Sequence, residues 1–141
     1  MPGSSNVASA LASVPFFSGL NQKQLKMIAD SGKEISYDSG ETIVEEGTMG
    51  VGFYLVVDGK VEVRKKTKTL ATLSKGQYFG EMSLIDEQPR SADVAAILPT
   101  TCFTISTWVF SALIKAHPEL ALPMLKEFAK RLRAAQSSPT S

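Results

Sequence analysis

Residues 79–94 read FGEMSLIDEQPRSADV and separate two groups of short predicted β-strands with one helical turn. Gly80 allows the backbone to approach a ligand closely, and a turn that begins near Glu81 presents unpaired N–H groups, which attract an anion. Arg90 adds a full positive charge and a forked set of donors that fits two phosphate oxygens. On charge alone, however, Glu81 and Arg90 would also fit a surface ion pair. The segment therefore predicts a local anion site within a β domain.

Around this segment, residues 33–106 carry short β-type runs separated by Gly, Asp or Pro at intervals of roughly 8 to 12 residues. Strands are predicted at 35–37, 42–44, 52–57, 60–64, 70–73, 93–97 and 101–106. Asp58-Gly59 is the strongest hairpin signal, and it predicts that 52–57 meets 60–64 across a tight turn. Seven or eight such strands predict a jelly roll.

The N-terminal part of the chain contains one well-marked helix. Asn21 is a good N-cap with Gln24 three residues later, and Gly32 ends the helical pattern. Residues 1–13 and 136–141 are small or polar, and we predict that both are flexible tails.

Helical periodicity returns after Ser106. Thr107 is predicted to cap a helix over 108–116, and His117-Pro118 interrupts the chain before a last helix. Pro123 must lie in the first turn of that helix or kink it.

Composition limits the classes of function that remain. The 141 residues fit one domain, and 43% hydrophobic content supplies a core. Fifteen basic against fourteen acidic residues leave a net charge of +1, which gives no general attraction for nucleic acid or membranes. The basic run at 64–68 is predicted to be a solvated hairpin loop, and Cys102 a buried thiol. Without a signal peptide or an apolar run of roughly 18 residues, we expect a cytoplasmic protein.

The sequence argues against a metal-dependent enzyme. Metal sites on jelly rolls need two or more histidine ligands with a carboxylate, whereas His117 is the single histidine and lies outside the predicted strands. We therefore predict no metal site and no catalytic residues.

The ordered motifs resemble the cyclic nucleotide-binding domains of catabolite activator-type regulators, protein kinase A regulatory subunits and cyclic nucleotide-gated channels. The most specific match is the family's phosphate-binding cassette, represented by FGEMSL at 79–84 and PRSADV at 89–94, and we use "cassette" for residues 79–94. YDSGETI at 37–43, EG at 46–47 and DG at 58–59 look like the family's upstream signatures. The resemblance covers roughly residues 14–135.

The resemblance implies a mainly β fold with flanking α-helices. The expected core is an eight-stranded jelly-roll β-barrel, or double-stranded β-helix, with an N-terminal helical segment, a short cassette helix and two C-terminal helices. The corresponding boundaries are 14–32 for the N-terminal helices, 33–106 for the barrel and 107–135 for the C-terminal helices.

The resemblance also implies roles for individual residues. Arg90 would bind the exocyclic phosphate oxygens and Glu81 the ribose 2′-hydroxyl, while Ser91 is compatible with a preference for cAMP. The implied ligand-binding set is Gly80, Glu81, Met82, Ser83, Arg90, Ser91 and Ala92 from the cassette, and Val63, Ala71 and Leu73 from the strands facing the base. A lid is implied in the last helix, through Phe128, Arg131 or Leu132.

The implied function is a regulatory sensor for cAMP, with cGMP as the other candidate ligand, whose C-terminal helices move on binding. The alternative is a protein-interaction domain of the same fold with a degenerate, ligand-free pocket. Expected partners are a protein or a fused effector domain, and the state a monomer or a homodimer through the C-terminal helix. Only residues 136–141 follow that helix, so we expect no DNA-reading helix-turn-helix in this chain.

Overall fold

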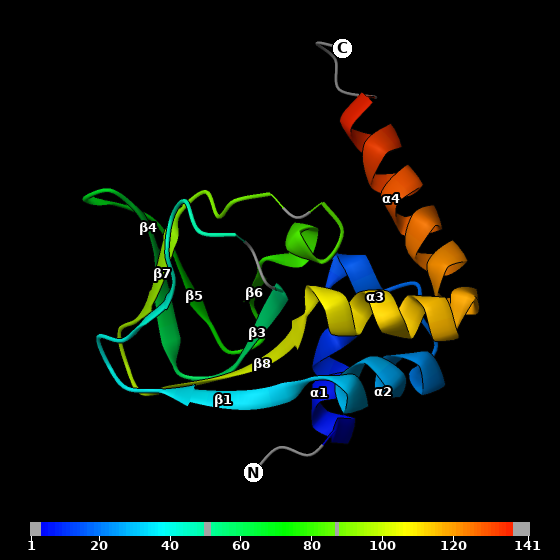
Figure 1. Ribbon diagram of the computed structural model, residues 1–141, viewed down its shortest axis with the longest axis horizontal. Coiled ribbons are helices and arrows are strands. Elements are labelled where there is room, and N and C mark those ends of the chain that lie inside the picture. The colour runs from blue at the N-terminus through cyan, green and yellow to red at the C-terminus, as the bar shows by residue number, and fades with distance from the viewer. Residues whose placement is uncertain (1–3, 50–51, 87, 137–141) are drawn as a thin grey trace.

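The described residues form two four-stranded antiparallel sheets, with the helices gathered at one end of the strands (Figure 1). This computed structural model describes residues 4–49, 52–86 and 88–136. The strand order is β1-β8-β3-β6 in one sheet and β2-β7-β4-β5 in the other. The strands are β1 (Lys33–Tyr37), β2 (Thr42–Val44), β3 (Gly52–Asp58), β4 (Lys60–Lys65), β5 (Lys68–Ser74), β6 (Tyr78–Phe79), β7 (Asp93–Ala96) and β8 (Thr100–Ser106).

The pairing of these strands is nested. The first strand pairs with the eighth, the second with the seventh, the third with the sixth and the fourth with the fifth, all antiparallel. Two sheets built in this way are a jelly roll. The predicted fold class is therefore confirmed.

Helices precede and follow the sheets. They are α1 (Ser4–Leu11), the 3₁₀ turn η1 (Pro15–Phe17), α2 (Gln22–Ser31), α3 (Thr107–Ala116), the 3₁₀ turn η3 (Pro118–Leu120) and α4 (Ala121–Gln136). The predicted capping box of α2 is confirmed, because the Asn21 side chain accepts from the Gln24 N–H at 2.8 Å and the Gln24 side chain accepts from the Asn21 N–H at 3.0 Å. Pro123 lies in the first turn of α4. None of the described helices is long and apolar enough to cross a membrane.

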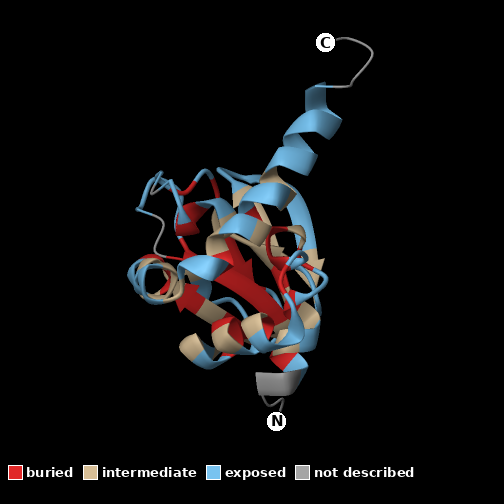
Figure 2. Ribbon diagram, turned by 90° about the vertical axis from the view of Figure 1, so that its right-hand side faces the viewer, coloured by how far each residue is buried: buried red, intermediate tan, exposed pale blue. Residues whose placement is uncertain are grey.

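Two apolar clusters form the core. The smaller one lies between the sheets and includes Tyr54, Val56, Val61 and Cys102. The larger one joins the helices to β3 and β8, and within it the ring of Phe16 contacts the rings of three other phenylalanines, Phe17, Phe110 and Phe128. Figure 2 shows these buried strands at the centre and the distal part of α4 projecting away as exposed helix.

The N-terminal segment corrects one prediction. We expected residues 1–13 to be a flexible tail, but Ser4–Leu11 is helical, and its Val7 and Leu11 are buried in the larger cluster. Apolar residues recur at helical spacing here, at Val7, Leu11 and Val14, and all three are buried. The free energy gained by burying them outweighs the tendency of the polar residues before them to stay disordered. In the predicted C-terminal tail, Gln136 is instead the last residue of α4, and residues 137–141 lie outside the described residues.

The expected hairpin at Asp58-Gly59 is wrong. β3 and β4 belong to different sheets, so the chain turns a corner there instead of folding back on itself. Gly59 has φ +99°, and a Cβ on it would lie 2.5 Å from the Pro99 carbonyl oxygen. The Asp-Gly signal reports a positive φ, and a corner between sheets requires this conformation as much as a hairpin does.

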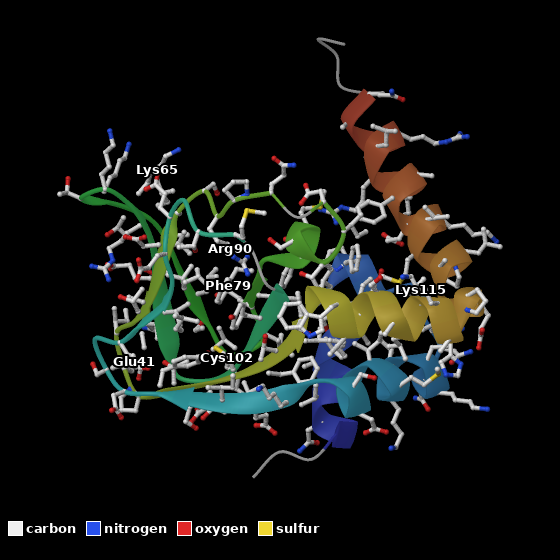
Figure 3. All side chains as sticks on the ribbon, viewed as in Figure 1. Glu41, Lys65, Phe79, Arg90, Cys102 and Lys115 are labelled. Atoms are coloured by element: carbon white, nitrogen blue, oxygen red, sulfur yellow. The ribbon has the colours of Figure 1, made fainter. Side chains whose placement is uncertain are left out.

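The tight hairpin instead joins β4 to β5. Only Lys66 and Thr67 separate the two strands, and Lys66 adopts φ +57°. The basic run at 64–68 therefore spans a hairpin, as predicted, with Lys66 and Thr67 in the turn and Lys65, labelled in Figure 3, at the end of β4.

Two local predictions around the C-terminal helices and the cassette need correction. Ser106, and not Thr107, caps α3, because the Ser106 side chain accepts from the Val109 N–H at 3.3 Å. The sequence reading also missed β6, since two residues are too few to show the alternation of a strand.

The corner at Gly59 yields a stability prediction. Gly59→Ala should destabilise the fold more than Gly76→Ala does, because Gly76 has a similar φ of +89° but nothing within 4 Å of its added Cβ. We expect about 1–2 kcal/mol for Gly76→Ala from backbone strain, and about 1–3 kcal/mol beyond that for Gly59→Ala. Urea unfolding of both variants measures the difference, and equal losses would show that Pro99 and Thr100 do not constrain the corner.

Candidate functional site

The cassette forms one wall of a pocket with a volume of about 380 Å³. The opposite wall comes from β2 and β4, through Val44 and Val63. The cassette connects β6 in one sheet to β7 in the other, so the pocket lies where the chain passes between the sheets. The cassette residues that line it are Phe79, Gly80, Glu81, Met82, Ser83, Asp86, Gln88, Pro89, Arg90, Ser91, Ala92 and Val94.

The cassette begins with a turn that requires glycine. Gly80 adopts a left-handed conformation with φ +81° and precedes the 3₁₀ turn η2 (Glu81–Leu84), in which the Ser83 N–H donates to the Gly80 carbonyl at 3.1 Å. A Cβ at position 80 would lie 2.5 Å from Nη1 of Arg90 and 2.7 Å from the Gly52 carbonyl oxygen. Glycine is therefore needed both for the backbone angle and for the close approach of Arg90.

The later part of the cassette is fixed through its backbone. The Arg90 N–H donates to the Thr48 carbonyl at 2.7 Å, and the Arg90 carbonyl accepts from the Gly47 N–H at 2.9 Å. Three residues further on, an Asp93 carboxylate oxygen accepts from the Glu46 N–H at 2.6 Å. These bonds place the Arg90 side chain opposite the Gly80 turn.

Arg90 is only 9% exposed. Its Nη2 donates to the Gly52 carbonyl at 2.6 Å, and its Cζ lies 5.7 Å from the centroid of the Tyr54 ring. Nε is buried without a hydrogen-bond partner, and no carboxylate in the described ranges forms an ion pair with Arg90. Burial lowers the pKa of Arg90 and the nearby Tyr54 opposes this, but an arginine stays charged. Figure 3 shows Arg90 close to Phe79 inside the strand framework.

The remaining cassette residues predicted to bind ligand also line the pocket. Glu81 is half-buried, and its carboxylate makes no hydrogen bond or ion pair within the part of the chain that the structure describes. Ser83 and Ala92 are 8% exposed, whereas Met82 and Ser91 are exposed. The structure thus brings together all seven cassette residues of the predicted set.

Of the three strand residues predicted to face the base, one lines the pocket and two do not. Val63 on β4 lines the pocket, while Ala71 and Leu73 on β5 do not. β5 lies at the outer edge of its sheet, beyond β4, where Ala71 is exposed and Leu73 half-buried. The role of these two in holding a base stays a prediction.

The three predicted lid residues lie away from the pocket. Phe128 packs its ring at 5.1 Å against Phe16 and lines an apolar groove with Leu84 and Ile85, on the other side of η2. Leu132 is 59% exposed. Arg131 is exposed, and its charge lowers the pKa of Tyr78, against the larger raising effects of burial and of Glu81.

Sequence reasoning missed three residues that support the site. Gly52 and Tyr54 contact the Arg90 guanidinium from β3, and the Thr107 hydroxyl donates to the Ser83 carbonyl at 2.9 Å. Gly52 acts through its main-chain carbonyl and Tyr54 through its ring, and the two residues lie two positions apart on β3. No local signal marks Thr107 as a partner of the cassette.

Comparison with known proteins finds relatives whose sequences align with most of this chain. A cGMP-dependent protein kinase from Plasmodium berghei is 33% identical over 91% of this chain and 14% of its own length. The cAMP-dependent protein kinase regulatory subunit of Schizosaccharomyces pombe is 38% identical over 75% of this chain and 26% of its own length. This chain therefore spans about a quarter or less of each of these relatives.

A solved structure has the same fold over nearly its full length. It is the N-terminal domain of a transcriptional regulator from Streptomyces coelicolor A3(2), with a TM-score of 0.87 and 27% identity over 92% of this chain and 96% of that chain. The family described as the cyclic nucleotide-binding domain matches residues 34–117, which include all eight strands except the first residue of β1. This chain belongs to the cyclic nucleotide-binding domain family.

Proposed function

We propose that the chain is a regulatory sensor that binds a cyclic nucleotide in the cassette pocket, with cAMP as the first candidate and cGMP as the second. The observation that carries the proposal is the buried, charged guanidinium of Arg90, whose Nε has no partner among the described residues. A buried charge is unfavourable unless it is paired and hydrogen-bonded. A ligand phosphate at the Gly80 turn would supply both the opposite charge and the missing acceptor.

The Glu81 carboxylate supports a sugar next to that phosphate. It lines the same pocket as Arg90 and makes no hydrogen bond or ion pair in the described part of the chain, so its oxygens are available to a ribose hydroxyl. A phosphate held by Arg90 and a hydroxyl held by Glu81 are the two groups that a cyclic nucleotide presents together. The relatives named for cAMP and for cGMP leave both bases as candidates.

The contact between Thr107 and Ser83 supports a signal to the C-terminal helices. Thr107 is the first residue of α3, and its buried hydroxyl donates to the carbonyl of Ser83 within the cassette turn. A ligand that reorganises η2 would therefore act directly on the start of α3. Helix movement requires that the ligand prefer one arrangement of this contact over the other.

The alternative of a ligand-free interaction domain is less well supported. It would leave the charged Arg90 guanidinium buried in a pocket with Nε lacking an acceptor and with no ligand to pair the charge. We propose that the effector is a partner protein or a fused domain that reads the position of α3 and α4.

The first prediction concerns Arg90. Arg90→Ala should weaken cyclic nucleotide binding by roughly 10- to 150-fold, since a hydrogen bond to a charged group contributes about 1.5–3 kcal/mol. Calorimetric titration with cAMP and with cGMP measures the loss and ranks the two ligands. Arg64→Ala is the matched control, because Arg64 is paired with Glu62 at 3.2 Å and lies outside the pocket. No heat and no thermal shift with either nucleotide would refute the sensor and favour the ligand-free domain.

The second prediction concerns the ribose. A 2′-deoxy analogue should bind less tightly than the parent nucleotide by about 1–3 kcal/mol, because it leaves the Glu81 carboxylate without its donor. Glu81→Ala should remove most of that difference, while Asp86→Ala, which deletes another carboxylate lining the pocket, should preserve it. Equal affinities of the wild-type protein for both nucleotides would rule out this role for Glu81.

The third prediction concerns the link to α3. Thr107→Val keeps the shape of the side chain but removes the donor to Ser83, whereas Thr107→Ser keeps the hydroxyl. We expect hydrogen exchange to show that cyclic nucleotide alters the protection of both η2 and α3 in the wild type and in Thr107→Ser, but only of η2 in Thr107→Val. Unchanged protection of α3 on ligand binding in the wild type would contradict the proposed signal.

A further inference from the structure

We propose that Tyr54 is the positioning residue for Arg90: the face of its aromatic ring holds the guanidinium so that the charge is oriented toward an incoming anion. The inference rests on the proposed function of the pocket. Tyr54 belongs to β3 and is neither part of the cassette nor part of the pocket lining. Its role would therefore be exerted through Arg90 and not through contact with the ligand.

The ring is placed and fixed for this purpose. The Arg90 Cζ lies 5.7 Å from the ring centroid, within the roughly 6 Å over which an aromatic face attracts a cation. Tyr54 is 7% exposed and stacks on Phe79 with centroids 4.8 Å apart and an interplanar angle of 6°. Tyr54 and Phe79 are also partners in the β3–β6 register, so the backbone holds the two rings together.

β3 contacts the guanidinium at two points. The main-chain carbonyl of Gly52 accepts from Nη2, and the ring of Tyr54, two residues later on the same strand, lies near Cζ. A hydrogen bond and a ring contact together restrict both the position and the orientation of the guanidinium. Nε is left without an acceptor in the described structure, and this is the donor that an anion would use.

An aromatic ring is well suited to this task. A carboxylate beside Arg90 would neutralise the charge and would compete with a phosphate for the same in-plane donors. A ring interacts through its face, stabilises the cation only in part and leaves those donors free. Tyr54 thus orders the buried Arg90 before the ligand binds, and the positive charge of Arg90 is not neutralised.

The experiment varies the electron density of the aromatic ring at position 54 and leaves the shape of the ring nearly unchanged. Tyr54→Phe should keep the affinity for cAMP and cGMP, and replacing that phenylalanine by increasingly fluorinated phenylalanines should weaken binding stepwise, to roughly 3- to 30-fold for the pentafluorinated ring. Val56→Ala is the matched control, because Val56 is 1% exposed in the same apolar cluster and two residues further along the same face of β3. It should lower the unfolding midpoint and leave the affinity unchanged.

A second measurement requires no ligand. The ring current of Tyr54 should shift the Nε–H resonance of Arg90 in the NMR spectrum of the free protein, with the shift kept in Tyr54→Phe and lost in Tyr54→Leu. An Nε–H that is unaffected by Tyr54→Leu, or affinities that do not change along the fluorinated series while Arg90→Ala still weakens binding, would overturn the inference. If neither nucleotide binds the wild type, the proposed function fails, and the Nε–H shift alone decides whether Tyr54 positions Arg90.

Discussion

The site depends on one constraint, which is that a charged guanidinium is buried without a described carboxylate beside it. The fold meets this constraint with weak, neutral partners: a carbonyl oxygen at Gly52 and the face of the Tyr54 ring. It also leaves space for the guanidinium by placing a glycine at position 80. The charge is thus tolerated but not neutralised, as the proposed anion-binding role requires and as a structural ion pair would not leave it.

The nested pairing of the strands explains why these groups meet. Because β3 pairs with β6 and β4 pairs with β7, the segment between β6 and β7 must cross from one sheet to the other next to both β3 and β4. The cassette is that crossing segment. Groups from the central strand β3 therefore support Arg90, while Val63 on β4 forms the opposite side of the pocket.

The sequence predicted most of this arrangement, and its errors have physical causes. Cassette residues could be found because glycine, carboxylate and arginine occur together at a fixed spacing, and all seven line one pocket. The Asp-Gly at 58–59 misled because a local turn signal does not say which sheet the next strand joins. Tyr54 and Thr107 could not be recognised, since their partners are distant in sequence and only the register of the sheets brings them together.

The junction between β8 and α3 has a mechanical consequence. The strand ends at Ser106 and the helix begins at Thr107, so no linker lies between them to absorb a displacement. Ser106 is paired with Gly52, the residue that holds Arg90. In the proposed sensor, a shift at the guanidinium would be passed to α3 through this pairing as a rotation of the helix, and from α3 to the non-helical residue His117, with φ −133° and ψ 71°. Beyond it, the 16 residues of α4, about 24 Å long, would convert a small rotation into a large sweep of the helix end.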